Sequence, residues 1–113
     1  MPHLVKMSEL PSSGGARRFE AGEYGANVSF FLVDSEPGQG PEPHSHPYGE
    51  VFVVLSGQVQ FTVGGKTIDA ETSDIVVAEA ETEHCFVNDG AGRLEMVNIH
   101  ASGEMITRWL GEA

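Results

Sequence analysis

The sequence contains little cysteine and no long apolar run, and both absences narrow what the protein can be. Cys85 is the single cysteine among 113 residues, so an intramolecular disulfide is excluded and a reducing compartment is expected. No apolar run approaches the roughly 20 residues that span a bilayer. The first residues, Met1–Lys6, lack the apolar region of a secretory signal. We therefore expect a cytoplasmic protein that does not enter a membrane.

Basic residues are also scarce. The chain has 6 Lys and Arg against 17 Asp and Glu, a net charge of −11, and its one adjacent basic pair is Arg17-Arg18. Phosphate backbones are bound by clustered Lys and Arg. Binding to nucleic acid or to an anionic membrane surface is therefore not expected.

Helical periodicity is nearly absent, whereas turn residues are frequent, with 14 Gly and 6 Pro. Segments rich in β-branched and aromatic residues recur between the turns, which is typical of an all-β sandwich or barrel. The length allows one domain. We expect an arm and loop over residues 1–24, followed by a β-barrel domain over residues 25–113. The predicted strands are 27–33, 50–56, 58–63, 66–70, 75–79, 84–88 and 93–101.

Local sequence signals predict one tight turn and one short helix. Gly64-Gly65 lies between two predicted strands and predicts a two-residue hairpin loop, because glycine accepts the positive φ angles of such a turn. Glu104–Leu110 is predicted to form a short C-terminal helix, with Ser102 as its N-cap and Gly111 as its C-cap. In that helix, Trp109 would anchor the segment on the barrel.

The segment Val51–Leu55 is apolar at every position, so both faces of the predicted strand are apolar. A strand of this kind is covered on both sides. Its outer cover would be another strand layer, the N-terminal arm or a second subunit. A homodimer is therefore expected.

Polar residues with metal-binding side chains gather just before this strand. Side chains alternate along an extended chain, so His44 and His46 point to the same side, one pleat apart. Pro43 and Pro47 flank the pair and favour the extended conformation. Glu50 has the same parity and can return a carboxylate to that side. Two imidazoles and a carboxylate form a set that divalent transition metals accept while keeping open positions.

A further candidate ligand is His84, at the start of its own predicted strand. Imidazoles suit Fe, Mn, Ni, Zn or Cu, whereas three His with one carboxylate argue against Ca or Mg. The alternative is that each His is a hydrogen-bonded turn or core residue. The joint placement of three His with a Glu favours the metal site, with the identity of the ion left open.

The sequence resembles the cupin family. The first cupin motif is matched at every specified position by Gly38-x5-His44-x-His46-x3-Glu50-x6-Gly57. The second motif, G-x5-P-x-G-x2-H-x3-N, aligns over residues 73–88 with His84 and Asn88 in place. The sequence departs from it at three turn positions, which are Ser73, Glu79 and Glu81. These departures concern the geometry of the loops and not the set of ligands.

The resemblance implies a single-domain double-stranded β-helix of the jelly-roll type. It implies that the residues at positions 44, 46, 50 and 84 bind a divalent metal within the barrel. It also implies a dimer. Cupins include oxygenases, isomerases, sensors and storage proteins, so the fold alone does not give the function.

Four further residues are candidates for the wall of a substrate pocket. Phe52 and Phe86 share parity with the nearby ligands and would line the cavity, although ordinary core packing is an equal alternative. Tyr48 lies in the loop between two ligands, where it would pack at the rim or donate a hydrogen bond to a bound molecule. His100 is a candidate acid–base group or a partner of a ligand, with a structural role as the alternative. No catalytic residue is predicted beyond the metal ligands.

Two classes of function follow. The first is a metal-dependent enzyme of oxygenase or isomerase type that acts on a small molecule in the barrel cavity. The second is a non-catalytic, metal-bearing protein that binds or senses a small molecule. A purely structural metal is a third possibility.

Overall fold

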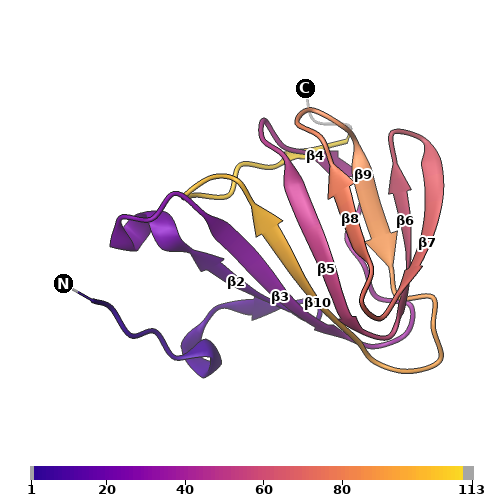
Figure 1. The fold of residues 1–113 in the computed structure, drawn as a ribbon, viewed down its shortest axis with the longest axis horizontal. Helices are drawn as coiled ribbons and strands as arrows, with labels where there is room; N and C mark the ends of the chain where they lie inside the picture. Colours follow the sequence, from indigo (N-terminus) through magenta and orange to yellow (C-terminus); the bar gives the residue numbers. More distant parts are fainter. Residues whose placement is uncertain (1, 111–113) are drawn as a thin grey trace.

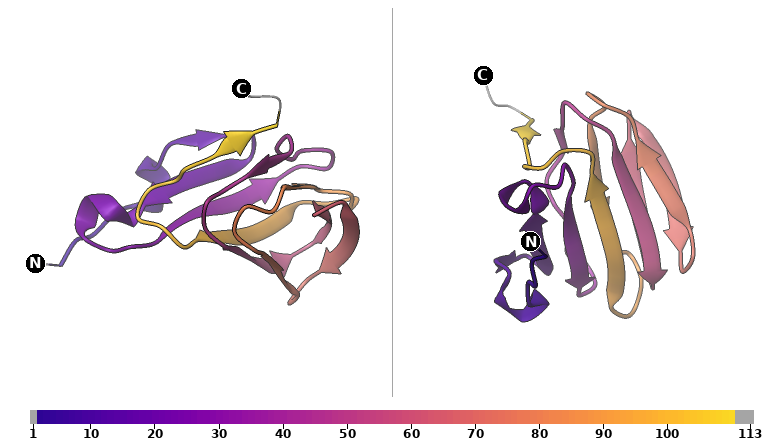
Figure 2. Two further views of the ribbon diagram at one scale, coloured as in Figure 1. Left: turned by 90° about the horizontal axis from the view of Figure 1, so that it is seen from above. Right: turned by 60° about the vertical axis from the view of Figure 1, so that its left-hand side comes forward.

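The computed structural model describes residues 2–110, whose strands form two antiparallel sheets (Figures 1 and 2). Within this range, one sheet has six strands in the order β1 (Ser12–Ser13), β2 (Ala16–Glu20), β3 (Ser29–Ser35), β10 (Leu94–His100), β5 (Glu50–Ser56) and β8 (Ile75–Ala78). The other has five, in the order β11 (Arg108–Trp109), β4 (His44–Ser45), β9 (His84–Val87), β6 (Gln58–Val63) and β7 (Lys66–Glu71).

The prediction of an all-β chain is confirmed. Each of the seven predicted strands is present, with ends that differ by no more than two residues. The reason is visible in β6, where Val59 and Phe61 are fully buried while Gln60 between them is partly exposed. This period of two is the one that a sheet with a single buried face imposes. The hairpin at Gly64-Gly65 is also confirmed, because both residues have positive φ, 56° and 80°.

The two sheets share one apolar core. Its buried side chains come from β3, β5, β8 and β10 of one sheet and from β6 and β7 of the other: Val33, Phe52, Val54, Val59, Phe61, Ala70, Val76, Ala78, Leu94 and Met96. Burial of each larger side chain in this set contributes roughly 1.5–3 kcal/mol. The core therefore fixes how the sheets face each other.

Along the inner face of β10 the core gives way to polar residues. Leu94 and Met96 are buried and apolar, whereas Asn98 and His100 on the same face are buried and polar. His100 lies opposite Glu50 of β5 in the strand register. The inner face therefore ends in a group of buried polar side chains rather than in solvent.

The predicted C-terminal helix is not present. Instead, the segment after β10 crosses to the five-stranded sheet, where β11 pairs with β4 through Trp109 opposite His44. The backbone N–H of Ile106 donates to the Tyr48 hydroxyl, and its carbonyl accepts from His46. These groups cannot also serve a helix, which explains the difference. The predicted C-cap, Gly111, lies outside the described residues.

The helices of residues 2–110 are two short 3₁₀ turns, η1 (Met7–Glu9) and η2 (Ala21–Tyr24). None of the helices in this range is long and apolar enough to cross a membrane. The segment predicted as an arm contributes β1 and β2, and β2 pairs along β3.

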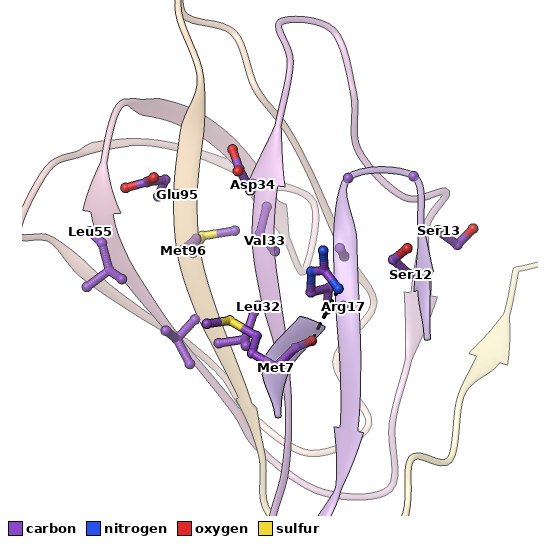
Figure 3. Close-up of a pocket in the computed structure, with 14 residues that line it drawn as sticks. Met7, Ser12, Ser13, Arg17, Leu32, Val33, Asp34, Leu55, Glu95 and Met96 are labelled. Carbon is purple, nitrogen blue, oxygen red and sulfur yellow. Dashed lines mark hydrogen bonds between the residues drawn. The ribbon is translucent and has the colours of Figure 1, made fainter. Parts of the chain in front are cut away.

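The outer face of the six-stranded sheet is apolar across four adjacent strands. The side chains on it are Phe30, Leu32, Val51, Val53, Leu55, Ile75, Val77, Val97 and Ile99, all at least partly exposed. Met7 of η1 lies beside Leu32 at one border, where Arg17 donates to the Met7 carbonyl (Figure 3). The N-terminal arm therefore reaches only a corner of this face, and no further strand layer within residues 2–110 covers the rest.

Candidate metal centre

Three local features of the backbone bring the four predicted ligands together. His44 of β4 lies directly opposite His84 of β9, His46 follows two residues later, and Glu50 is the first residue of β5. All four are buried. One ligand atom from each lies within 4.8 Å of the others. The four residues can therefore hold one metal ion.

The three imidazoles share one hydrogen-bond pattern on the side away from the centre. Each Nδ1 faces a backbone carbonyl: Glu42 at 2.7 Å from His44, Ile106 at 2.8 Å from His46, and Thr82 at 2.8 Å from His84. A carbonyl oxygen only accepts, so each Nδ1 carries the hydrogen. In the neutral imidazole this leaves the Nε2 lone pair free. Backbone contacts of this kind orient histidines that bind metal.

The contacts around Glu50 test whether a metal fits. Its Oε1 lies 3.1 Å from Nε2 of His46 and 3.1 Å from Nε2 of His84. When both imidazoles carry their hydrogen on Nδ1, these contacts bring lone pairs together. Buried Nε2 of His46 also has no hydrogen-bond partner. A cation between the nitrogens and the oxygen satisfies all of them, so the donor set fits a divalent metal.

The charge of the carboxylate is also appropriate for a ligand. Burial favours the neutral form of Glu50, but the imidazoles of His100, His46 and His84 outweigh it and hold the pKa well below its usual range. Burial lowers the pKa of His44. Burial also opposes protonation of His84, yet the carboxylate of Glu50 and the carbonyl of Thr82 raise its pKa. A proton at His84 can therefore stand in for the cation.

A second set of contacts holds the other carboxylate oxygen. Nε2 of His100 lies 3.2 Å from Oε2 of Glu50, and its Nδ1 lies 2.6 Å from the hydroxyl of Tyr48. The carboxylate favours a hydrogen on Nε2, so Nδ1 of the neutral ring accepts from the phenol. Burial raises the pKa of Tyr48, which keeps the phenol protonated. His100 thus differs from the three ligands, because its Nδ1 faces a hydroxyl and not a backbone carbonyl, while Oε1 of Glu50 lies beside the ligand nitrogens.

A cavity of about 340 Å³ adjoins the cluster. Of the predicted pocket residues, Phe86 and His100 line it. Phe52 is 1% exposed and lies in the core, and Tyr48 lies behind His100. The cavity is therefore on the side of the cluster that faces β3 and β10.

Comparison with known families agrees with this geometry. The family model described as the cupin domain matches residues 31–100, more than half of the chain and including all four ligand positions. The chain is a cupin. No curated protein matches the sequence.

Solved structures show the same fold. Oxalate decarboxylase of Bacillus subtilis, described with Mn(II) centres, is similar over 90% of this cupin with a TM-score of 0.78 and 23% identity. A protein of unknown function from Streptococcus pyogenes is similar over 71% of this chain and 68% of its own, with a TM-score of 0.62 and 19% identity. This cupin spans 30% of the length of the decarboxylase chain.

Several residues around the centre were not predicted from the sequence. Trp109 packs on His44 with ring centroids 5.0 Å apart, and it lines the cavity together with Thr107. Asn98 and Ser35 line its inner wall. The alternation of β10 placed Asn98 in phase with His100, and that phase was the available signal. For the C-terminal segment no local signal existed, because its partners lie about 60 residues earlier in the chain.

Proposed function

We propose that this cupin is a metal-dependent enzyme that acts on a small molecule in the cavity, by chemistry of the oxygenase or isomerase type. One observation carries the proposal, namely that three of the four ligand residues, His44, His46 and Glu50, line a cavity. Four protein ligands leave one or two positions free on a five- or six-coordinate ion, which separates a working site from a structural one. When bound, the metal supplies Lewis-acid or redox chemistry at those positions.

The residues of the chain have separable roles in this proposal. His44, His46, His84 and Glu50 hold the ion. The apolar walls, among them Phe86, restrict water around the bound molecule. His100 keeps a proton on Nε2 beside Glu50, and Tyr48 keeps that tautomer in place.

The ligand types limit which metal is used. Three imidazoles and one carboxylate suit Fe, Mn, Ni, Zn or Cu. The Mn(II) centres of the oxalate decarboxylase support Mn as one candidate among these. The identity of the ion stays open, as does the cytoplasmic location predicted from the sequence.

The second candidate is a non-catalytic, metal-bearing protein that binds a small molecule. It is favoured by the composition of the cavity wall. Within the described part of the chain, the titratable side chains that line the cavity are His44, His46, Glu50 and His100. No separate acid or base stands opposite the cluster among those residues, so turnover would depend on the metal and His100.

We also propose that two copies of the chain pack through the outer face of the six-stranded sheet. Four strands about 4.8 Å apart, each presenting roughly 17 Å of length, give an apolar face of several hundred Å². Met7, which is 57% exposed and lies beside Leu32, extends it. A stable interface needs about 800 Å² from each partner. The charged residues Asp34 and Glu95 lie at one end of the strands on this face. The apolar remainder suits a second identical sheet related by a two-fold axis.

The test of the enzymatic proposal begins with tag-free protein loaded separately with each candidate metal. Oxygen consumption is measured against catechols, diketones and thiols, and isomerase activity by proton exchange of hydroxyketones in deuterated water. We expect turnover with at least one metal, loss of turnover in Glu50→Gln, and retention in Glu83→Gln, which alters an exposed carboxylate. Tight binding of a small molecule without turnover would favour the binding protein instead.

A further inference from the structure

The wall of the cavity contains a buried amide that has no partner for its oxygen. Asn98 of β10 is 3% exposed and lines the cavity, and its Oδ1 has no hydrogen-bond partner. In the strand register it lies between Phe31 of β3 and Phe52 of β5. A buried acceptor among aromatic rings is unfavourable unless a donor reaches it. Because Asn98 lines the cavity, a molecule bound there can bring a donor to its amide.

A second buried polar atom lies on the same wall. Ser35 is 2% exposed, lines the cavity, and its Oγ also has no partner. Water or a ligand can satisfy it. Two unpartnered groups on the wall formed by the six-stranded sheet indicate that a bound molecule carries polar atoms besides those that bind the metal.

Much of the rest of the cavity wall is apolar and aromatic. Phe31, Val33, Phe86, Pro41 and Trp109 line it. Asn98 is two residues from His100 on the same face, which is about 6.8 Å along the strand. Because His100 contacts Glu50, Asn98 lies about the length of one aromatic ring along the strand from a residue that borders the metal centre. The volume of about 340 Å³ lies at the small end for ligand pockets.

The cavity wall also lacks a counterion for a second negative charge. Among the described residues that line it, Glu50 is the one acidic residue, and Lys and Arg are absent. An anionic group placed away from the metal would be desolvated without a cationic partner. A rigid dianion with its charges at opposite ends, such as terephthalate, therefore does not fit this cavity well.

Together these observations indicate the chemical class of molecule that the cavity binds. We infer that the cavity binds a small aromatic molecule with one anionic oxygen group at the metal and one neutral hydroxyl or amide donor directed to Oδ1 of Asn98. The inference rests on the proposed function, because a metal in the four-residue site holds the anionic end. The donor group and the single charge follow from Asn98 and from the lining residues.

The test uses tag-free protein loaded with Zn(II), which is redox-inert, and isothermal calorimetry with four probes. The probes are 4-hydroxybenzoate, benzoate, terephthalate and oxalate. We expect 4-hydroxybenzoate to bind about tenfold more tightly than benzoate, as one hydrogen bond to a buried acceptor provides. Terephthalate is expected to bind more weakly than benzoate, whereas oxalate, which can place both charges at the metal, reports on the metal site.

Variants assign the preference to Asn98. In Asn98→Leu, which keeps the size but removes the acceptor, the two benzoates are expected to bind with equal affinity. Gln58→Leu, which removes an exposed amide on β6, is the control and is expected to keep the tenfold ratio. If Asn98→Leu does not fold, the order of the three aromatic probes on the wild-type protein decides.

Three results would overturn the inference. Equal binding of benzoate and 4-hydroxybenzoate rules out the donor that contacts Asn98, and tight binding of terephthalate rules out the restriction to a single charge. Failure of the three aromatic probes to bind Zn(II)-loaded protein removes the aromatic class while leaving the metal site intact. Protein that takes up no Zn(II) overturns the proposed function as well, so elemental analysis of the same sample separates the two failures.

Discussion

At the scale of single residues, the tautomers decide what the centre can do. His44, His46 and His84 each donate Nδ1–H to a backbone carbonyl, whereas His100 presents Nε2 to Glu50. The first pattern leaves three lone pairs for one ion. The second occupies one carboxylate oxygen and leaves the other free for the ion.

This arrangement predicts that His100 positions Glu50 without binding the metal. His100→Phe keeps the ring volume and removes the hydrogen on Nε2, so the metal Kd is expected to rise about 10–100-fold. Competition with a chromogenic chelator measures it. His3→Phe, in the exposed arm, is the control. An unchanged Kd in His100→Phe would contradict the positioning role.

The ligand cluster could be predicted from the sequence, whereas the contact between His100 and Glu50 could not. The parity of His44 and His46, with Glu50 beyond them, indicated the cluster because neighbours along a strand have a fixed geometry. The sequence did not show whether His100 contacts Glu50. The partner strands decide it, since His100 lies opposite Glu50 only in the observed register.

At the scale of elements, two turns have a backbone shape that their residues disfavour. Ser73 and Glu81 have φ of 77° and 67°, and they are the non-glycine residues with positive φ in the described part of the chain. Both occupy positions at which the second cupin motif has glycine. The turns therefore keep their geometry although the glycines are absent.

Relief of this strain predicts a more stable variant. Ser73→Gly removes the Cβ that disfavours a positive φ, which outweighs the added freedom of the unfolded chain. We expect the free energy of unfolding to rise by about 0.5–1 kcal/mol, measured by urea denaturation. Ser12→Gly, at a position without positive φ, is expected to give no such gain. A destabilised Ser73→Gly would contradict the account of this turn.

The C-terminal segment is the element that the sequence predicted wrongly. Its spacing of Met105 and Trp109 favoured a helix, but its partners are Tyr48, His46 and His44. Local periodicity carries no information about such distant partners. The exposed Arg108 of this segment forms an ion pair with Glu81, in which Nη1 lies 2.8 Å from Oε2. This ion pair favours an acidic residue at the turn around Glu81.

If Trp109 shields the centre, its removal exposes His44 to water. Trp109→Ala is expected to leave the metal stoichiometry unchanged and to accelerate removal of the metal by a chelator several-fold, because the ring that packs on His44 is lost. Stopped-flow transfer to the chelator measures the rate. Ile68→Ala, on β7 of the same sheet, is the control. An unchanged rate in Trp109→Ala would show that the ring does not shield the metal.

At the scale of the whole molecule, each sheet face has a different environment. The inner faces share the core and end at the metal centre, whereas the outer face of the six-stranded sheet is apolar and exposed. The sequence predicted this two-sided apolarity from Val51–Leu55. It did not show what covers the outer face, because another strand layer, the N-terminal arm and a second subunit are all compatible with the same pattern.

Association through the outer face makes a direct prediction. Ile75 and Val77 of β8 are 64% and 59% exposed, so replacing both with Lys costs the fold little and places charge within the proposed interface. We expect a dimer for the wild-type protein and a monomer for this double variant, by light scattering after size exclusion. Ile68→Lys on the other sheet is expected to remain a dimer. A wild-type monomer at high concentration would contradict the interface.

The most direct measurement is crystallography of tag-free protein grown with one supplied metal, with anomalous data at its absorption edge. The account predicts one peak per chain, bonded to Nε2 of three imidazoles, about 2.1 Å away for Zn(II), and to Oε1 of Glu50. His84→Ala should lose the peak. A peak bonded through Nδ1, a peak elsewhere, or an unchanged peak in His84→Ala would contradict the metal centre on which the function depends.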